Sequence, residues 1–159
     1  MTNKRPRVWE RGRRIRLFTP LVVATAAMMA LMALAVTTAA QDGTSSASEG
    51  VFTDEQATRG EVAYQQECAT CHRDDLLGDG IAPALTGAAF DMRWKELSVG
   101  DMFVAIGTKM PLGAPASLGR PTYVDIVSYL LKRNHFPAGS RELPTDEGAL
   151  AKIIIPTPR

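Results

Sequence analysis

An apolar stripe near the carboxyl end of the chain is the strongest periodic signal in the sequence. Apolar side chains recur there with the three- and four-residue spacing of one helix face, at Tyr123, Ile126, Val127, Leu130 and Leu131. Charged and polar residues occupy the other faces, at Asp125, Ser128, Lys132 and Arg133. Because this spacing has the period of an α-helix, the pattern predicts a helix over residues 120–134.

A second helix is predicted from the signal at its start. Thr53 and Gln56 have the spacing of a capping box, and Phe52 precedes them as the first half of a hydrophobic staple. These residues predict a helix over 54–68.

Glycine and proline limit regular structure between these two helices. Residues 73–89 are expected to form little regular secondary structure. The prolines within residues 110–115 exclude a helix over that segment. A short helix is predicted from Ser98, with Asp101 in its first turn, to about Gly107. Since no segment alternates like a strand, the predicted fold class is all-α, with three to four short helices.

The first 40 residues differ chemically from the rest. Residues 1–20 hold seven basic side chains and one acidic one, residues 21–36 are apolar apart from one threonine, and Thr38-Ala39-Ala40 offers small residues for cleavage. This order is typical of a secretory signal. An uncleaved anchor stays open as an alternative, because the uncharged residues 21–40 could span a bilayer as a membrane tether. Either interpretation places residue 41 onward on the exported, periplasmic side of the membrane.

The exported part has a composition of its own. Residues 41–159 contain 11 basic and 16 acidic side chains, which argues against a nucleic-acid partner. Residues 41–51 are rich in serine and glycine and are predicted to form a flexible linker. A folded domain is expected over 52–143, followed by a Pro-rich tail over 144–159, whose isoleucines at 153–155 are expected to fold back onto the domain.

Cys68, Cys71 and His72 form a C-x-x-C-H motif, which is typical of covalent haem attachment. Two thiols three residues apart can add to the two vinyl groups of a haem, and the adjacent histidine can ligate the iron. A redox dithiol would be expected in a βαβ pattern, which is absent, and a zinc site would have only the distant His135 as a fourth ligand. The motif therefore predicts one covalently attached haem c with its iron.

With this motif in place, residues 52–143 resemble a class I c-type cytochrome. Gly60 and Tyr64 precede Cys68 at the spacings of the family's first helix, and Ile126 and Tyr129 are similar to residues of its last helix. The resemblance implies an all-α fold around one haem, in which these two helices cross at the glycine.

The resemblance also implies a ligand set. Pro83 begins a P-x-L loop, and in the family the carbonyl of such a proline accepts the N–H of the proximal histidine, here His72. The sixth ligand in the family is a methionine in an extended loop, which favours Met110, followed by Pro111. The alternatives are three other residues, which are expected to lie in packing segments or at the surface: Met92, Met102 and His135.

The segments 110–118 and 123–139 resemble more closely the single-haem cytochromes that accompany periplasmic quinoprotein dehydrogenases. This chain departs from them at residues 119–121 and at His135. The resemblance implies a one-electron carrier, not an enzyme, with no catalytic residues. Its redox partners would be a quinoprotein dehydrogenase or respiratory complex and a terminal acceptor. A membrane-tethered haem subunit of a larger oxidoreductase and a haem enzyme with an open sixth position stay as alternatives.

Overall fold

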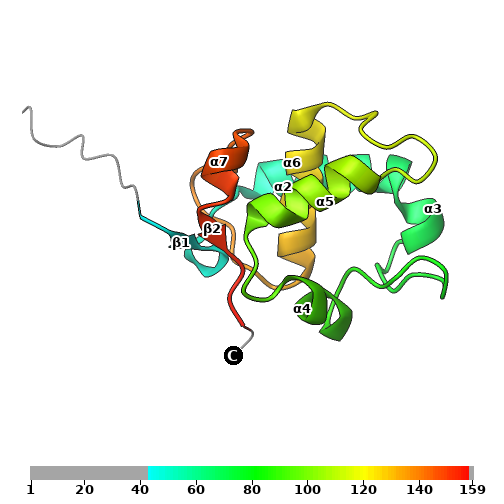
Figure 1. The fold of residues 1–159 in the computed structure, drawn as a ribbon, viewed down its shortest axis with the longest axis horizontal. Coiled ribbons are helices and arrows are strands. Elements are labelled where there is room, and N and C mark those ends of the chain that lie inside the picture. The colour runs from blue at the N-terminus through cyan, green and yellow to red at the C-terminus, as the bar shows by residue number, and fades with distance from the viewer. Residues whose placement is uncertain (1–42, 158–159) are drawn as a thin grey trace, which may run out of the picture. The chain divides into compact units, whose positions relative to one another are not determined.

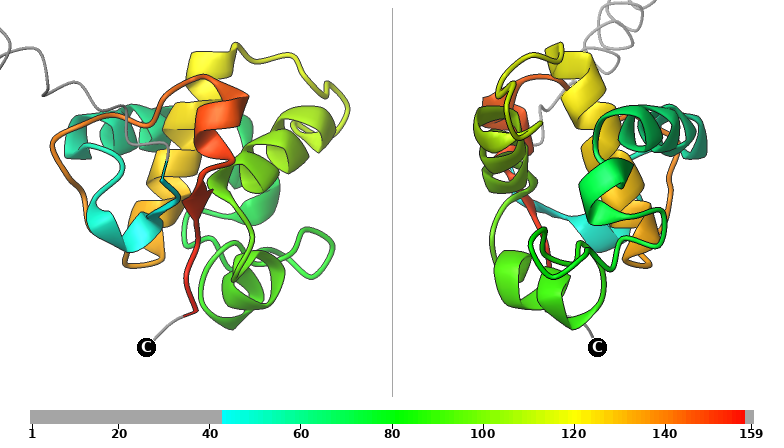
Figure 2. Two further views of the ribbon diagram at one scale, coloured as in Figure 1. Left: turned by 60° about the vertical axis from the view of Figure 1, so that its left-hand side comes forward. Right: turned by 90° about the vertical axis from the view of Figure 1, so that its right-hand side faces the viewer.

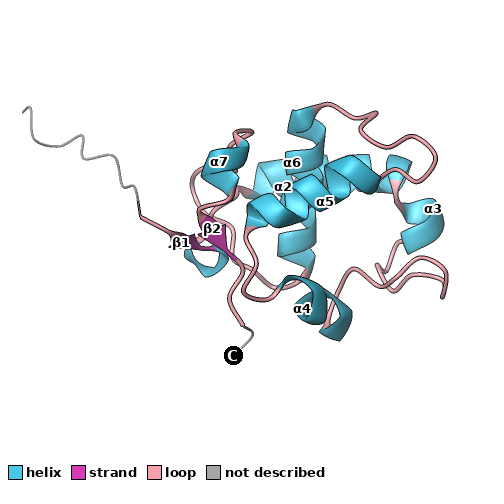
Figure 3. Cartoon of the chain, viewed as in Figure 1, coloured by secondary structure: helices cyan, strands magenta, loops and turns pink. Residues whose placement is uncertain are grey.

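Helices make up nearly all of the regular structure in the computed structural model, which describes residues 43–157 (Figures 1 and 3). This confirms the predicted all-α class. The six α-helices in this range exceed the three or four predicted, because three of them span only four to seven residues. The elements are β1 (Ser45–Ser46), η1 (Ala47–Glu49), α2 (Asp54–Glu67), α3 (Ala69–His72), α4 (Ala88–Trp94), α5 (Val99–Lys109), α6 (Arg120–Arg133), α7 (Glu147–Leu150) and β2 (Ile153–Ile154).

The two longest helices, α2 and α6, cross in direct contact (Figure 2). A Cβ atom added to Gly60 of α2 would overlap the backbone carbonyl of Asp125 in α6, so only glycine permits this approach. One turn further along, the buried rings of Tyr64 and Tyr129 lie with their centroids 5.2 Å apart. The predicted crossing at Gly60 is therefore confirmed.

The apolar stripe of α6 faces the core, as its spacing predicted. Its five members are at most 4% exposed: Tyr123, Ile126, Val127, Leu130 and Leu131. Helix α5 packs beside α6 and begins with a complete capping box, in which Ser98 and Asp101 each bond the other's backbone N–H. Met102 of α5 is fully buried, in agreement with the prediction that it is a core residue.

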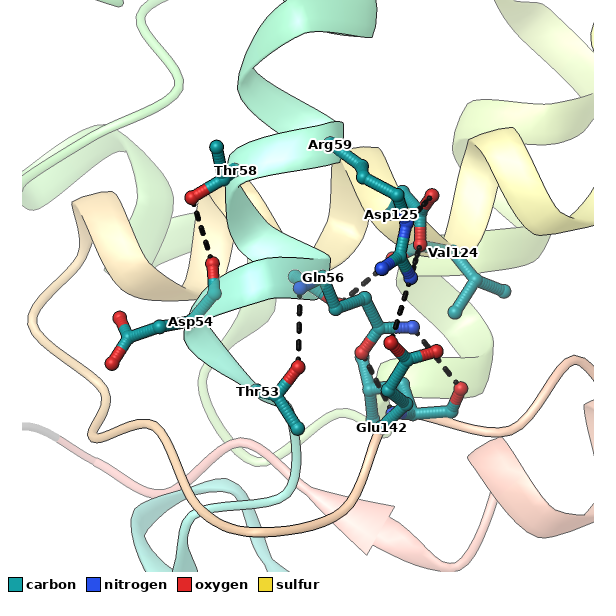
Figure 4. A network of polar contacts seen from close by, with 10 residues as sticks. Thr53, Asp54, Gln56, Thr58, Arg59, Val124, Asp125 and Glu142 are labelled. Atoms are coloured by element: carbon teal, nitrogen blue, oxygen red, sulfur yellow. Dashed lines mark hydrogen bonds and ion pairs between the residues drawn. The ribbon is translucent and has the colours of Figure 1, made fainter.

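The start of α2 differs in one respect from its prediction (Figure 4). The Thr53 hydroxyl accepts a hydrogen bond from the Gln56 N–H at 3.1 Å, which confirms the cap. The Gln56 side chain does not complete the box. It instead donates to the Leu143 carbonyl at 3.2 Å and accepts from the Leu143 N–H at 2.8 Å. This pair of bonds fixes the segment after α6 against the first helix.

A charged network reinforces the same junction at the surface. The Arg59 guanidinium bonds both carboxylate oxygens of Asp125, at 3.0 and 3.1 Å, and the Glu142 carboxylate at 2.9 Å (Figure 4). Arg59 therefore links α2, α6 and the segment that follows α6.

The predicted flexible linker over 41–51 is ordered where the structure describes it. Ser45 and Ser46 of β1 pair in parallel with Ile153 and Ile154 of β2, and Ala47 is fully buried. Such two-residue strands are too short to show an alternating pattern, so they could not be predicted from the order of residues. The composition suggested a linker, but the buried alanine ties this segment to the core.

The C-terminal segment folds back onto the domain, as expected for its isoleucines. Ile153 and Ile155 are at most 7% exposed. The backbone of Ile155 donates to Leu97 at 2.9 Å and accepts from Glu96 at 2.7 Å, next to the start of α5. The tail therefore packs against the N-terminal end of α5, and α7 lies beside the same helix (Figure 2).

The predicted secretory signal or membrane anchor, residues 1–40, lies outside the described residues. Within 43–157, none of the helices combines the length and the apolar character needed to cross a bilayer.

Candidate haem site

The C-x-x-C-H motif occupies the junction between α2 and α3. The long helix ends at Glu67, and a new turn begins in which the Cys68 carbonyl accepts from the N–H groups of Cys71 (3.2 Å) and His72 (3.0 Å). Cys68 is partly buried and Cys71 is exposed, and both thiols are free. Burial, aided by the charge of Glu67, raises the pKa of the Cys68 thiol to about 11, so this thiol is protonated at neutral pH.

The His72 ring is buried and oriented by a single backbone acceptor. Its Nδ1 lies 2.9 Å from the Pro83 carbonyl oxygen, the contact that the resemblance implied. A carbonyl oxygen can only accept, so Nδ1 carries a proton, and the tautomer of the neutral ring that fits this contact has its lone pair on Nε2. Nε2 is therefore the ring nitrogen that this contact leaves for a metal.

The backbone just after His72 has an unusual conformation. Arg73 has φ 65° and ψ 160°, a region that side chains other than glycine rarely adopt. Its carbonyl accepts a 2.7 Å hydrogen bond from the hydroxyl of the buried Tyr64. The core tyrosine thus holds the strained residue that follows the histidine. Sequence patterns did not indicate this role for Tyr64.

A hydrogen-bonded loop connects the motif to Pro83. Asp79 accepts from the N–H groups of Ala82 at 2.7 Å and Ile81 at 2.9 Å, and these two bonds hold the pKa of its carboxyl below the usual range. The Leu85 N–H donates to the Leu76 carbonyl at 2.8 Å. Pro83 is therefore fixed on both sides along the chain. The Asp-Gly dipeptide at 79–80 was a turn signal that could have located the first of these anchors.

Met110 caps the C-terminal end of α5. Its N–H donates to the Ile106 carbonyl at 2.9 Å, and its own carbonyl accepts from the Tyr123 hydroxyl at 2.7 Å. The residue is partly buried, and the peptide bond to Pro111 is cis. The loop after α5, yellow in Figure 1, and α3 lie toward the same end of the domain. Ligation of a metal by Met110 stays a prediction.

The alternative ligands lie in different environments. Met102 is in the core, with no exposed surface. Helix α4 packs on the core through Phe90 and Trp94, as predicted for this segment, but the side chain of Met92 is 83% exposed. His135 is exposed, and its backbone has a left-handed conformation with φ 67°. It follows directly after Asn134, the C-cap residue of α6.

Exposed apolar side chains fit this site to a haem group. Leu77 and Ile81, in the loop between the motif and Pro83, are 59% and 93% exposed, and Leu112, just after Met110, is 83% exposed. These exposed side chains supply apolar surface of the kind against which a porphyrin ring packs. Together with two free thiols and the buried imidazole of His72, these residues suit a covalently held haem.

Comparison with known proteins agrees with this assignment. Residues 55–130, which run from α2 into α6, match the family model described as cytochrome c oxidase, cbb3-type, subunit III. No curated protein and no solved structure matches the chain. The matched residues include the C-x-x-C-H motif, and the match supports a class I c-type cytochrome domain. A domain of this type implies covalently bound haem c with its iron, and Cys68 and Cys71 fit the attachment motif. It also implies haem-based electron transfer with redox partner proteins.

Proposed function

We propose that the chain is a periplasmic one-electron carrier in which Cys68 and Cys71 attach the haem and His72 and Met110 are the axial ligands. The bound haem supplies one-electron cycling of iron between Fe(III) and Fe(II). The observation that carries this proposal is the contact of His72 Nδ1 with the Pro83 carbonyl, at 2.9 Å, directly after the attachment motif. It leaves Nε2 of a buried imidazole available as the proximal ligand.

Met110 is proposed to close the sixth position, so that the protein transfers electrons without binding a substrate at the iron. Its backbone is held on both sides by Ile106 and Tyr123, which limits where its thioether can move. A methionine ligand also raises the reduction potential relative to harder ligands. With both axial positions of the iron closed, the protein would act as an electron carrier and not as a haem enzyme.

The redox partner is proposed to present a basic surface around an apolar hollow. Asp74 and Asp75 follow Arg73, which comes directly after the motif. Asp74 is exposed, Asp75 is half-buried and pairs with Arg73 at 3.3 Å, and the exposed Asp79 lies two residues before the exposed Ile81. Opposite charge accelerates encounter, and added salt screens it. A quinoprotein dehydrogenase or a respiratory complex is the proposed donor. A terminal acceptor would reoxidise the carrier.

Oxidised and reduced absorption spectra of the exported protein test the ligand set. We expect the oxidised wild type to show the weak long-wavelength band of methionine–iron ligation, and Met110→Ala to lose it, bind CO when reduced and fall in potential. Met92→Ala is the matched control, because this exposed methionine should not affect the band. A Met110→Ala spectrum identical to the wild type would refute Met110 as ligand. CO binding by the wild type would favour an enzyme with an open position.

A second candidate function is a haem subunit tethered within a larger oxidoreductase complex. The description of the matching family model, a subunit of a cytochrome c oxidase, favours it, as does the apolar run over 21–36. The mass of the protein purified from membranes separates the two. A species that begins near Met1 indicates the tether, and one that begins after Ala40 indicates the free carrier.

A further inference from the structure

The C-terminal end of α6 makes an unusual set of contacts through one side chain. Asn134, the C-cap residue, donates from Nδ2 to the carbonyls of Leu130 at 2.8 Å and Leu85 at 3.0 Å. Its Oδ1 accepts from the Gly87 N–H at 3.0 Å. A single amide therefore caps its own helix and clamps a segment 47 residues earlier in the chain.

The clamped segment continues directly from the proximal acceptor. Leu85 lies two residues after Pro83, and Gly87 lies two residues further on, so Asn134 holds both ends of 85–87. The other end of the loop is fixed by Asp79, which bonds the N–H of Ala82, the residue before Pro83. The Pro83 carbonyl therefore lies between two anchors, and Asn134 ties the second of them to the end of the long helix α6 through two hydrogen bonds of 3.0 Å.

We propose that Asn134 is a positioning residue for His72. It holds the loop that places the Pro83 carbonyl 2.9 Å from His72 Nδ1, and so it fixes the direction and basicity of the imidazole. This inference rests on the proposed role of His72 as proximal ligand. Asn134 itself would contact neither the iron nor its ligands.

The expected effect has a definite sign. A strong hydrogen bond from Nδ1–H to a carbonyl makes the imidazole a better electron donor, which favours the oxidised metal. Loosening the loop weakens that bond and should raise the reduction potential. A tenfold loss of preference for the oxidised state corresponds to about 59 mV in a one-electron couple.

The test compares Asn134→Ala with Thr86→Ala in the haem-loaded protein. Thr86 lies in the same segment and its hydroxyl reaches the Arg133 carbonyl at only 3.5 Å, so its removal leaves both Asn134 clamps in place. Asn134→Ser is the second variant, for use if the alanine variant does not fold. A serine hydroxyl has one proton and is shorter, so it cannot bridge both partners.

The readouts are the reduction potential and amide hydrogen exchange of the reduced protein. We expect Asn134→Ala to raise the potential and to speed exchange of the Gly87 N–H about fivefold, from the loss of a hydrogen bond of about 1 kcal/mol. Asn134→Ser should shift both in the same direction, and Thr86→Ala should leave both unchanged.

An unchanged potential in the Asn134 variants, or an equal rise in Thr86→Ala, would overturn the positioning role while the carrier function stands. A wild type without covalent haem, or without a reversible one-electron couple, would overturn the proposed function and the positioning role with it.

Discussion

The backbone carbonyl of Asp125 occupies the space in which a side chain at Gly60 would lie. Helices α2 and α6 therefore touch backbone to backbone at this point, and the crossing that supports the haem motif depends on a missing methyl group. The motif begins only eight residues after Gly60, so a displaced α2 would displace its cysteines and histidine.

Gly60→Ala should lower the free energy of unfolding by about 2 kcal/mol or more, because the methyl group forces two backbones apart. Gly107→Ala in α5 is the matched control. A Cβ there meets only the Tyr123 ring, at 3.9 Å, so the variant should be neutral or up to about 1 kcal/mol more stable from helix propensity. Denaturant unfolding measures both, and equal effects would contradict the close crossing.

Tyr64→Phe should destabilise the domain by about 1–2 kcal/mol. It removes the 2.7 Å hydrogen bond to the Arg73 carbonyl and leaves that acceptor without its protein partner. Tyr129→Phe keeps the ring pair and loses only a bond from the exposed Arg133, so its cost should be smaller. Thermal unfolding compares the two. A larger loss in Tyr129→Phe would argue against the support of Arg73 by Tyr64.

Asp101→Asn should flatten the acid dependence of stability. Hydrogen bonds from the side chain and backbone of Ser98 lower the pKa of Asp101 in the folded protein. Between that pKa and the unfolded value of about 3.9, the unfolded chain binds more protons, so stability rises with pH. The contribution is present above about pH 4 and is lost as pH falls through the folded pKa. Unfolding curves between about pH 2 and 5 measure this slope, and an unchanged slope in the variant would contradict the prediction.

Ile155→Ala should cost about 2–4 kcal/mol, since this side chain is only 1% exposed in the folded tail. Its neighbour Ile154 is only partly buried, and Ile154→Ala should cost clearly less. Equal small effects in urea unfolding would show that the tail does not pack on the domain in solution.

Local signals were sufficient to predict the principal helices and the attachment motif. Each of these signals depends on residues that are close in sequence. Thr53 and Ser98 cap the first turns of their own helices, and the stripe of α6 repeats within two turns. The C-x-x-C-H motif indicates haem attachment by its residue types and spacing alone. Helix α4 was missed because it has only seven residues and its N-cap residue, Gly87, supplies no side-chain cap. The same limit applies to β1 and β2, whose partners are more than 100 residues apart.

Long-range hydrogen bonds account for the other differences. Gln56 has the right spacing for a capping box, yet its amide is used by Leu143, 87 residues away. From the sequence, Asn134 is an ordinary C-cap residue. In the folded protein its side chain also bonds the segment 85–87, which lies beside it. In both cases the residue type is compatible with a local role, and only the tertiary fold decides which partner it takes.

The parallel pairing of β1 with β2 determines where an N-terminal attachment would exert force. Strand β1 and helix α3 lie well apart, on opposite sides of the domain in Figure 1. Tension applied ahead of residue 43 would reach the β1–β2 pair before it reached the helix that carries His72. A fusion partner, an immobilising tag or a membrane anchor at that end should therefore leave α3 accessible. It should also leave the position of His72 undisturbed.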